Sequence, residues 1–125
     1  MNVVDSSGWL EYFGEGQNAG FFVPPIEKID QLIVPTICMY EVFKRLSNLV
    51  SEDEALGAVG VMSLGQVVEL NRQLALNAAK ISRELKLALA DSIILATARA
   101  NNATLWTQAE HFKDLDGVKY IEKKY

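Results

Sequence analysis

The 125-residue chain has one cysteine, one histidine and no long apolar run. The single cysteine, Cys38, excludes an internal disulfide, and its apolar surroundings predict a buried core thiol rather than a nucleophile. The single histidine, His111, lies in a polar turn and is interpreted as a surface residue rather than a metal ligand. No apolar run approaches the roughly 20 residues of a membrane span, and the N-terminus lacks the basic region of a signal peptide. We therefore expect a cytoplasmic protein without membrane contact.

Positive charge is also scarce, since the formal net charge is −4. This balance argues against nonspecific, charge-driven binding of nucleic acid. Half of the residues are apolar and 22% are charged, which is typical of a soluble globular protein. A chain of this length has room for one domain with a real core, so we expect residues 1–125 to form a single domain.

Short apolar segments alternate with helical patterns along the whole chain. This alternation predicts an α/β fold in which a central, mainly parallel sheet of four to five strands lies between two helical layers. Pro24 and Pro25 are expected to stop the second helix. The expected strands are 2–5, 32–34, 66–70, 103–107 and 118–121, and the expected helices are 6–13, 18–23, 36–49, 51–64, 71–85 and 90–100.

Three acids, Asp5, Glu41 and Asp91, stand where an apolar or neutral residue is expected. Asp5 ends the first apolar strand, whereas Glu41 and Asp91 follow apolar residues at helical spacing. Buried carboxylates cost several kcal/mol unless they are paired or bind a cation. Because ligands bind outside the carboxyl ends of parallel strands, the three acids are candidates for a site that binds a hard divalent metal.

Each acid also has an ordinary structural interpretation. Asp5 is a possible cap of the helix that begins at Ser6 or Ser7, and Asp91 is a possible helix N-cap. Glu41 is a possible solvated residue paired with Lys44 or Arg45, which lie three and four residues further along the same helix.

Four segments of the chain resemble the motifs of PIN-domain proteins, specifically VapC-type toxins of toxin–antitoxin pairs. Residues 3–10 (VVDSSGWL), 34–42 (VPTICMYEV) and 89–98 (LADSIILATA) resemble the three motifs that carry the acids. Residues 105–112 (LWTQAEHF) resemble the fourth, but Ala109 stands where the family usually has aspartate. The resemblance covers nearly the whole chain and implies a PIN-like three-layer α/β/α fold.

The resemblance implies a Mg²⁺- or Mn²⁺-dependent endoribonuclease that cuts RNA and is inhibited by a cognate antitoxin. In this interpretation Asp5 and Asp91 bind the metal, and Glu41 orients or deprotonates the attacking water. Ser6 and Thr107 are supporting hydrogen-bonding groups. The alternative is a degenerate PIN module that binds RNA or a protein partner but cleaves poorly, because Ala109 removes one acid.

Four aromatic residues are concentrated near the N-terminus. They are interpreted either as part of the core or, as the family resemblance suggests, as the lining of a groove for an antitoxin segment in a homodimeric toxin. Three lysines near the other end, Lys119, Lys123 and Lys124, are interpreted as solubilising residues. The four aromatic residues are Trp9, Phe13, Phe21 and Phe22.

Overall fold

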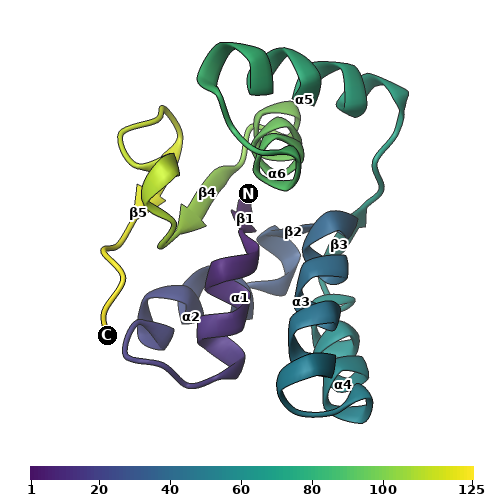
Figure 1. Cartoon of the computed structure of the whole chain (residues 1–125), viewed down its shortest axis with the longest axis vertical. Coiled ribbons are helices and arrows are strands. Elements are labelled where there is room, and N and C mark those ends of the chain that lie inside the picture. The colour runs from purple at the N-terminus through teal and green to yellow at the C-terminus, as the bar shows by residue number, and fades with distance from the viewer.

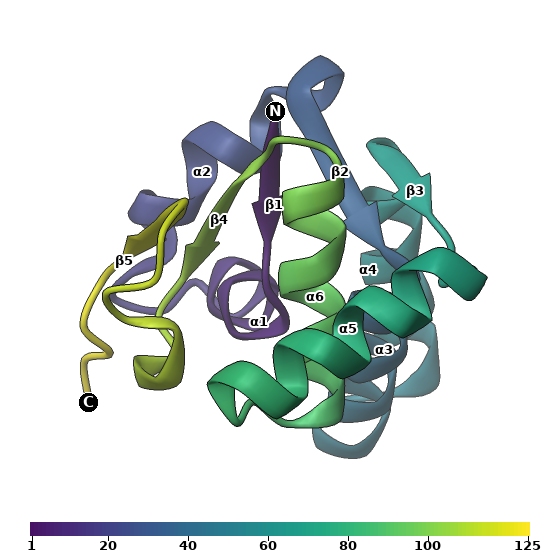
Figure 2. The same cartoon turned by 90° about the horizontal axis from the view of Figure 1, so that it is seen from above.

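Five short strands form one sheet in the order β3-β2-β1-β4-β5, and every neighbouring pair is parallel (Figure 2). The computed structural model describes all residues, 1–125. The expected α/β fold with a parallel sheet is therefore confirmed, and the sheet is parallel throughout. The strands are β1 (Asn2–Val4), β2 (Leu32–Pro35), β3 (Gln66–Val68), β4 (Thr104–Thr107) and β5 (Val118–Tyr120).

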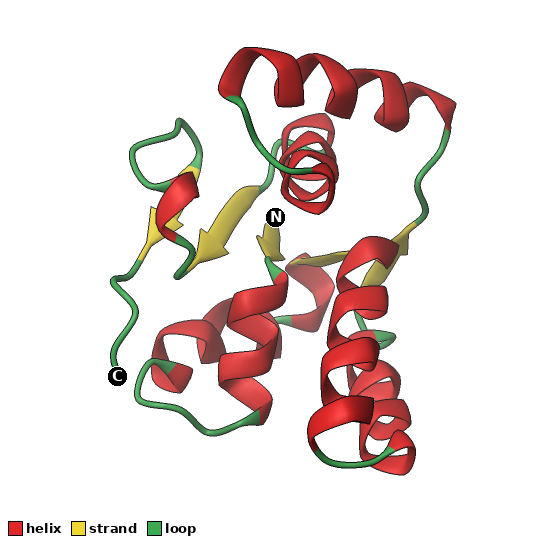
Figure 3. Cartoon of the chain, in the orientation of Figure 1, coloured by secondary structure: helices red, strands yellow, loops and turns green.

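The sheet lies between two helical layers (Figures 1 and 3). In Figure 1, α5 and α6 lie above the sheet and α1 to α4 lie below it, because the chain first builds strands on one side of β1 and then crosses back over the other face. No helix is long and apolar enough to cross a membrane. The helices are α1 (Ser6–Phe13), α2 (Ala19–Glu27), α3 (Thr36–Leu49), α4 (Glu52–Met62), α5 (Arg72–Leu85) and α6 (Leu89–Ala100), with short 3-10 turns η1 (Ile29–Gln31) and η2 (Glu110–Phe112).

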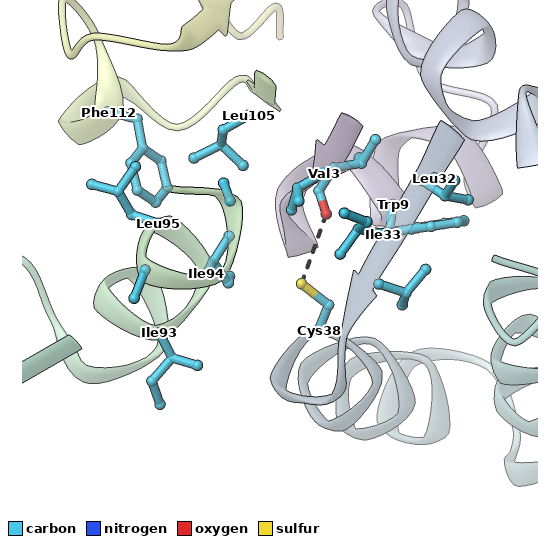
Figure 4. Close-up of a cluster of buried hydrophobic side chains, with 14 of the residues drawn as sticks. Val3, Trp9, Leu32, Ile33, Cys38, Ile93, Ile94, Leu95, Leu105 and Phe112 are labelled. Carbon is cyan, nitrogen blue, oxygen red and sulfur yellow. Dashed lines mark hydrogen bonds between the residues drawn. The ribbon is translucent and has the colours of Figure 1, made fainter. Parts of the chain in front are cut away.

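The core lies on both faces of the central strands. Val3 and Val4 of β1 are completely buried, and so is Val34 of β2. Two successive buried residues point to opposite faces of the sheet, which is what a strand covered on both sides requires. Figure 4 shows the resulting cluster, in which residues of α6 such as Ile94 pack on one side and Trp9 of α1 packs on the other.

The prediction that Pro24 and Pro25 stop the second helix was wrong. Helix α2 continues through both prolines to Glu27, although neither proline can donate a backbone hydrogen bond. Phe22, Pro25 and Ile26 are buried, and their spacing of three and four residues places them on one face. Burial of this face against the sheet stabilises the helix enough to offset the missing hydrogen bonds.

A glycine permits the close packing of α1 and α2. A Cβ atom at Gly8 would lie 2.5 Å from a ring carbon of Phe22 and 2.6 Å from a methyl carbon of Val4. Both neighbours are fully buried and have no room to move away. Gly8 therefore lets the start of α1 lie directly against β1, which fixes the position of the preceding residue, Asp5.

Candidate active site

The expected site lies where the direction of the chain connections reverses. The first connection leads from β1 to β2 on one side, and the later crossover returns to β4 on the other side of β1. In open parallel sheets such a reversal leaves a crevice outside the carboxyl ends of the strands. Asp5 directly follows β1 and Thr107 ends β4, while Glu41 and Asp91 lie in the first two turns of α3 and α6, which begin at this edge.

Both carboxylate oxygens of Asp5 accept hydrogen bonds from uncharged donors. Oδ1 accepts from the backbone N–H of Gly8 at 3.0 Å and from the hydroxyl of Ser7 at 2.7 Å. Oδ2 accepts from the hydroxyl of Thr107 at 2.6 Å, so Thr107 supports the acid as expected. Asp5 is thus the N-cap of α1, as one interpretation of this acid predicted. The capping role and the position in the candidate site coincide in one residue.

Asp5 is buried without a cationic partner. Its side chain is only 3% exposed, and burial raises its pKa from the usual 3.8 to about 6. The hydrogen bonds from Thr107, Ser7 and Gly8 lower the pKa in part, and the charge of Asp91 raises it slightly. Burial and the neighbouring charge of Asp91 both disfavour the ionised form of Asp5. A bound dication would stabilise the ionised form, so binding of a dication beside these acids would be favourable.

Glu41 is held by Ser6 rather than by a cation. The Ser6 hydroxyl donates to Oε1 of Glu41 at 2.5 Å, which links the start of α1 to α3. The alternative pairing of Glu41 with Lys44 or Arg45 is wrong, since neither forms an ion pair. Ser6 therefore supports the site by its hydrogen bond to Glu41. The hydroxyl groups that donate to Asp5 are those of Ser7 and Thr107.

The Asp91 carboxylate lies against the imidazole of His111. Asp91 lies in the first turn of α6, whose N-cap is Ala88, so the interpretation of Asp91 as a cap is wrong. Its Oδ2 atom lies 2.7 Å from Nε2 of His111. His111 was expected to be only a surface residue; its side chain is half exposed but contacts a candidate metal ligand. This contact fixes the carboxylate on the side of the site that faces η2.

The buried Cys38 thiol lies within reach of the charges of all three acids. Burial raises the pKa of this thiol far above its usual range, and the charges of Asp5, Glu41 and Asp91 act in the same direction. The Cys38 thiol also donates to the carbonyl oxygen of Val4 at 3.7 Å (Figure 4). The prediction of a buried core thiol is confirmed.

The three acids provide the type of ligand that a hard dication prefers, but they are not clustered around one point. Carboxylate oxygens are the ligands that Mg²⁺ and Mn²⁺ prefer. No three His, Cys, Asp or Glu side chains are grouped so that they could hold one ion together. Mg²⁺ commonly uses one or two carboxylates and several waters, and the pair Asp5 and Asp91 meets that requirement. The donor set therefore fits a metal held by two acids and water.

The groove residues were predicted only in part. Trp9 and Phe22 are completely buried, so the prediction that they line a surface groove was wrong and they belong to the core. Phe13 and Phe21 are partly exposed. Phe13 does line an apolar cavity between α1, α3 and α4, together with Leu46 and other side chains. Trp9 stacks on Phe13 with ring centroids 5.7 Å apart, so it supports that wall from beneath.

Two hydrogen-bonding residues of the site were not anticipated from the sequence, Ser7 and Gln108. Ser7 is one of two adjacent serines, and only the backbone geometry decides that it contacts Asp5 while Ser6 turns to Glu41. Gln108 is buried directly after Thr107 and accepts from the Asn18 amide at 2.9 Å. The sequence offers one indication of their role, which is that both residues lie within segments that resemble the family motifs.

Comparisons with known proteins agree with this geometry. The model of the PIN domain family matches residues 3–118. A chain of a toxin–antitoxin complex from Klebsiella pneumoniae is 22% identical and superposes with a TM-score of 0.80, over 95% of this chain and 96% of that one. A chain of VapBC2 from Rickettsia felis, solved with a DNA fragment from its promoter, is 14% identical with a TM-score of 0.74 over 97% of each chain.

VapC20 from Mycobacterium tuberculosis, a toxin that cleaves the sarcin-ricin loop, is 14% identical with a TM-score of 0.69, over 83% of this chain and 85% of that one. At these identities the structures share the fold and nothing finer is inferred from them. A comparison with curated proteins gave no match in sequence. The family model, which spans nearly the whole chain, is decisive: the protein belongs to the PIN domain family.

Proposed function

We propose that residues 1–125 act as one PIN domain that is a metal-dependent endoribonuclease, the toxin of a toxin–antitoxin pair. The observation that carries the proposal is the buried Asp5 carboxylate, which lies at the reversal point of the sheet beside Asp91 and has no cationic partner. Membership of the PIN family and the fold shared with VapC toxins support it.

The acids take distinct roles in the proposed reaction. Asp5 and Asp91 would hold Mg²⁺ or Mn²⁺, which would make water more acidic and neutralise charge on the phosphate. Glu41, kept in place by Ser6, would accept a proton from the water that attacks the phosphorus atom. The bond from phosphorus to the leaving ribose oxygen breaks in the same displacement, and that oxygen takes a proton from solvent. Thr107 and Ser7 keep the Asp5 carboxylate oriented. His111 contacts Oδ2 of Asp91, so a metal bound through that oxygen would compete with this contact.

The proposed partner is a cognate antitoxin, and the proposed form is a cytoplasmic homodimer. The cavity of about 320 Å³ between α1, α3 and α4 is a suitable place for an apolar antitoxin segment. Its wall includes Phe13, Leu46, Val50 and Val61, of which Val50 is 64% and Val61 39% exposed. A cluster of exposed apolar groups is typical of a surface that a partner covers.

A second candidate function is that of a PIN module that binds RNA or a protein and cleaves poorly. Two observations favour it: Ala109 lacks the acid that the family usually has, and His111 occupies one oxygen of Asp91. The two functions differ in catalysis, so incubation of purified protein with structured RNA decides between them. The nuclease cuts RNA with Mn²⁺ and stops with EDTA; the binding module retains RNA or a partner and leaves the RNA intact under both conditions.

Replacing Ala109 with aspartate is expected to strengthen metal binding. Ala109 follows Thr107 by two residues, and its backbone N–H donates to the Thr107 hydroxyl at 2.9 Å, so position 109 lies beside Asp5. A further acid that holds a metal or its water typically changes affinity by about 10–100-fold. Calorimetric titration with Mn²⁺ should show this gain for Ala109→Asp. Equal affinities in the two proteins would mean that three acids suffice.

A further inference from the structure

A cavity of about 460 Å³ opens next to the acids on the side of β5. Its wall includes Ser7, which donates to Asp5, and His111, which contacts Asp91. The remainder of the wall comes from the segment 108–113, which includes η2, and from the end of β5 and the segment after it. A ligand in this cavity would therefore touch two residues that hold the proposed catalytic acids.

We propose that this cavity binds the nucleotide next to the cleaved phosphate of a single-stranded RNA segment. In this proposal Tyr120 stacks on the base, and Lys113 and Lys123 bind the adjoining phosphates. The inference rests on the proposed ribonuclease function and adds to it the residues that position the substrate.

Strand register places Tyr120 in line with the acids. Thr107 of β4 pairs with Tyr120 of β5, and the backbone N–H of Asp5 donates to the carbonyl oxygen of Trp106. Laterally paired residues of a parallel sheet project to the same face. Asp5, Thr107 and Tyr120 thus form a row across three neighbouring strands. Two strand spacings, about 10 Å, separate the ends of this row, so one bound nucleotide can reach from one to the other.

The chemistry of the cavity wall suits RNA better than a purely apolar or acidic ligand. Lys113 lies with its Nζ atom 5.9 Å from the centre of the Tyr120 ring, so a cation and an aromatic face are presented together. Stacking on aromatic side chains and lysine contacts to phosphate are the two contacts that single-stranded nucleic acid uses. Neither Lys113 nor Lys123 forms an ion pair, and each ammonium group lies over an aromatic ring, that of Tyr120 or of Tyr125.

Two acids in the same cavity wall oppose nonspecific attraction of RNA by charge. Glu110 and Glu122 also line the cavity, and the whole chain carries a net charge of −4. Such a surface does not attract RNA indiscriminately, so binding depends on the few placed groups. Lys123, interpreted from the sequence as a solubilising residue, is one of these groups.

The absence of a side chain beyond Cβ at position 109 keeps the cavity open. Ala109 lines the wall between Gln108 and His111 and is partly exposed. An aspartate here would narrow the cavity and add a negative charge beside the phosphate. Ala109 thus favours occupation by substrate at the same position where it removes a metal-binding group.

Fluorescence anisotropy with a labelled single-stranded RNA tests the two lysines. The titrations use the Asp5→Asn protein, so that the RNA is not cut. Adding Lys113→Ala and Lys123→Ala is expected to weaken binding about 10-fold and to reduce the salt dependence, the slope of log K against log salt, by about 1.4 for two lost phosphate contacts. Lys28→Ala is the matched control, because Lys28 is exposed and precedes β2 at the opposite end of the sheet.

Two substitutions of Tyr120 test the stacking contact. Tyr120→Leu is expected to weaken RNA binding by about 10-fold, whereas Tyr120→Phe keeps the ring and should bind as the parent protein does. Unchanged affinity in both the double lysine variant and Tyr120→Leu would overturn the cavity assignment. If the wild-type protein nevertheless cuts RNA, the proposed function stands without it; if the wild type neither binds nor cuts any RNA, the function itself fails.

Discussion

Replacing Asp5 with asparagine is expected to reduce RNA cleavage by at least about 100-fold in the presence of Mn²⁺. The substitution removes one of two proposed metal ligands and the negative charge that holds the dication. The fold should survive, because asparagine is also a good N-cap and its oxygen can accept from Gly8 and Ser7. Its amide can donate to the hydroxyl of Thr107, which rotates to accept.

Initial rates on a fixed RNA measure this loss, and circular dichroism checks the fold. Asp30→Asn is a suitable control, since Asp30 is exposed in η1, before β2 and away from the carboxyl ends of the strands. The control should cleave at the wild-type rate. An Asp5→Asn protein that is folded and cleaves as fast as the control would show that the reaction does not depend on this acid.

The same substitution is expected to stabilise the metal-free fold by up to about 3 kcal/mol at pH 7.5. Burial raises the pKa of Asp5 from 3.8 to about 6, and each pKa unit corresponds to about 1.4 kcal/mol. Because the folded protein holds this proton more tightly than the unfolded chain, the contribution of Asp5 to stability falls as the pH rises from about 4 to about 6. Well below pH 3.8 the acid is protonated in both states and the penalty is absent.

Urea unfolding of the wild type and Asp5→Asn in EDTA at several pH values measures this effect. The difference in the free energy of unfolding should be largest above pH 6 and should shrink towards zero at pH 4. A difference that is independent of pH would mean that packing, and not the charge, distinguishes the two proteins. Asp30→Asn again serves as the control and should show no comparable pH dependence.

Opposite changes in activity and stability from one substitution would identify Asp5 as a functional acid. A residue kept only as a helix cap has no reason to be buried and destabilising when asparagine caps equally well. Addition of Mn²⁺ should then stabilise the wild type more than Asp5→Asn, since a ligand that binds only the folded state raises its stability.

Local patterns in the sequence were sufficient to predict the sheet and the position of the acids. The apolar segments around Val3 and Ile33 are buried on both faces and have the composition of parallel strands. Asp5 could be placed at the end of β1 because a parallel fold puts every strand end at the same edge. The resemblance to the PIN motifs then predicted that Glu41 and Asp91 lie at that edge as well.

Features that depend on distant contacts could not be predicted. Pro24 and Pro25 obey a local rule that favours a helix end, but burial of one face of α2 outweighs it. Trp9 was assigned to a surface groove because aromatic density does not reveal which rings turn inward. The pairing of His111 with Asp91 joins η2 to α6 across 20 positions of the chain, and no spacing within either segment indicates it.

The most direct test of the central claim is anomalous diffraction from crystals of the wild-type protein soaked in Mn²⁺. The account predicts an anomalous peak bound by the carboxylates of Asp5 and Asp91, with the His111 imidazole moved off Asp91, and no such peak in crystals of Asp5→Asn. If the protein cleaves RNA with Mn²⁺ but its crystals show no anomalous peak beside Asp5 and Asp91, the account is contradicted.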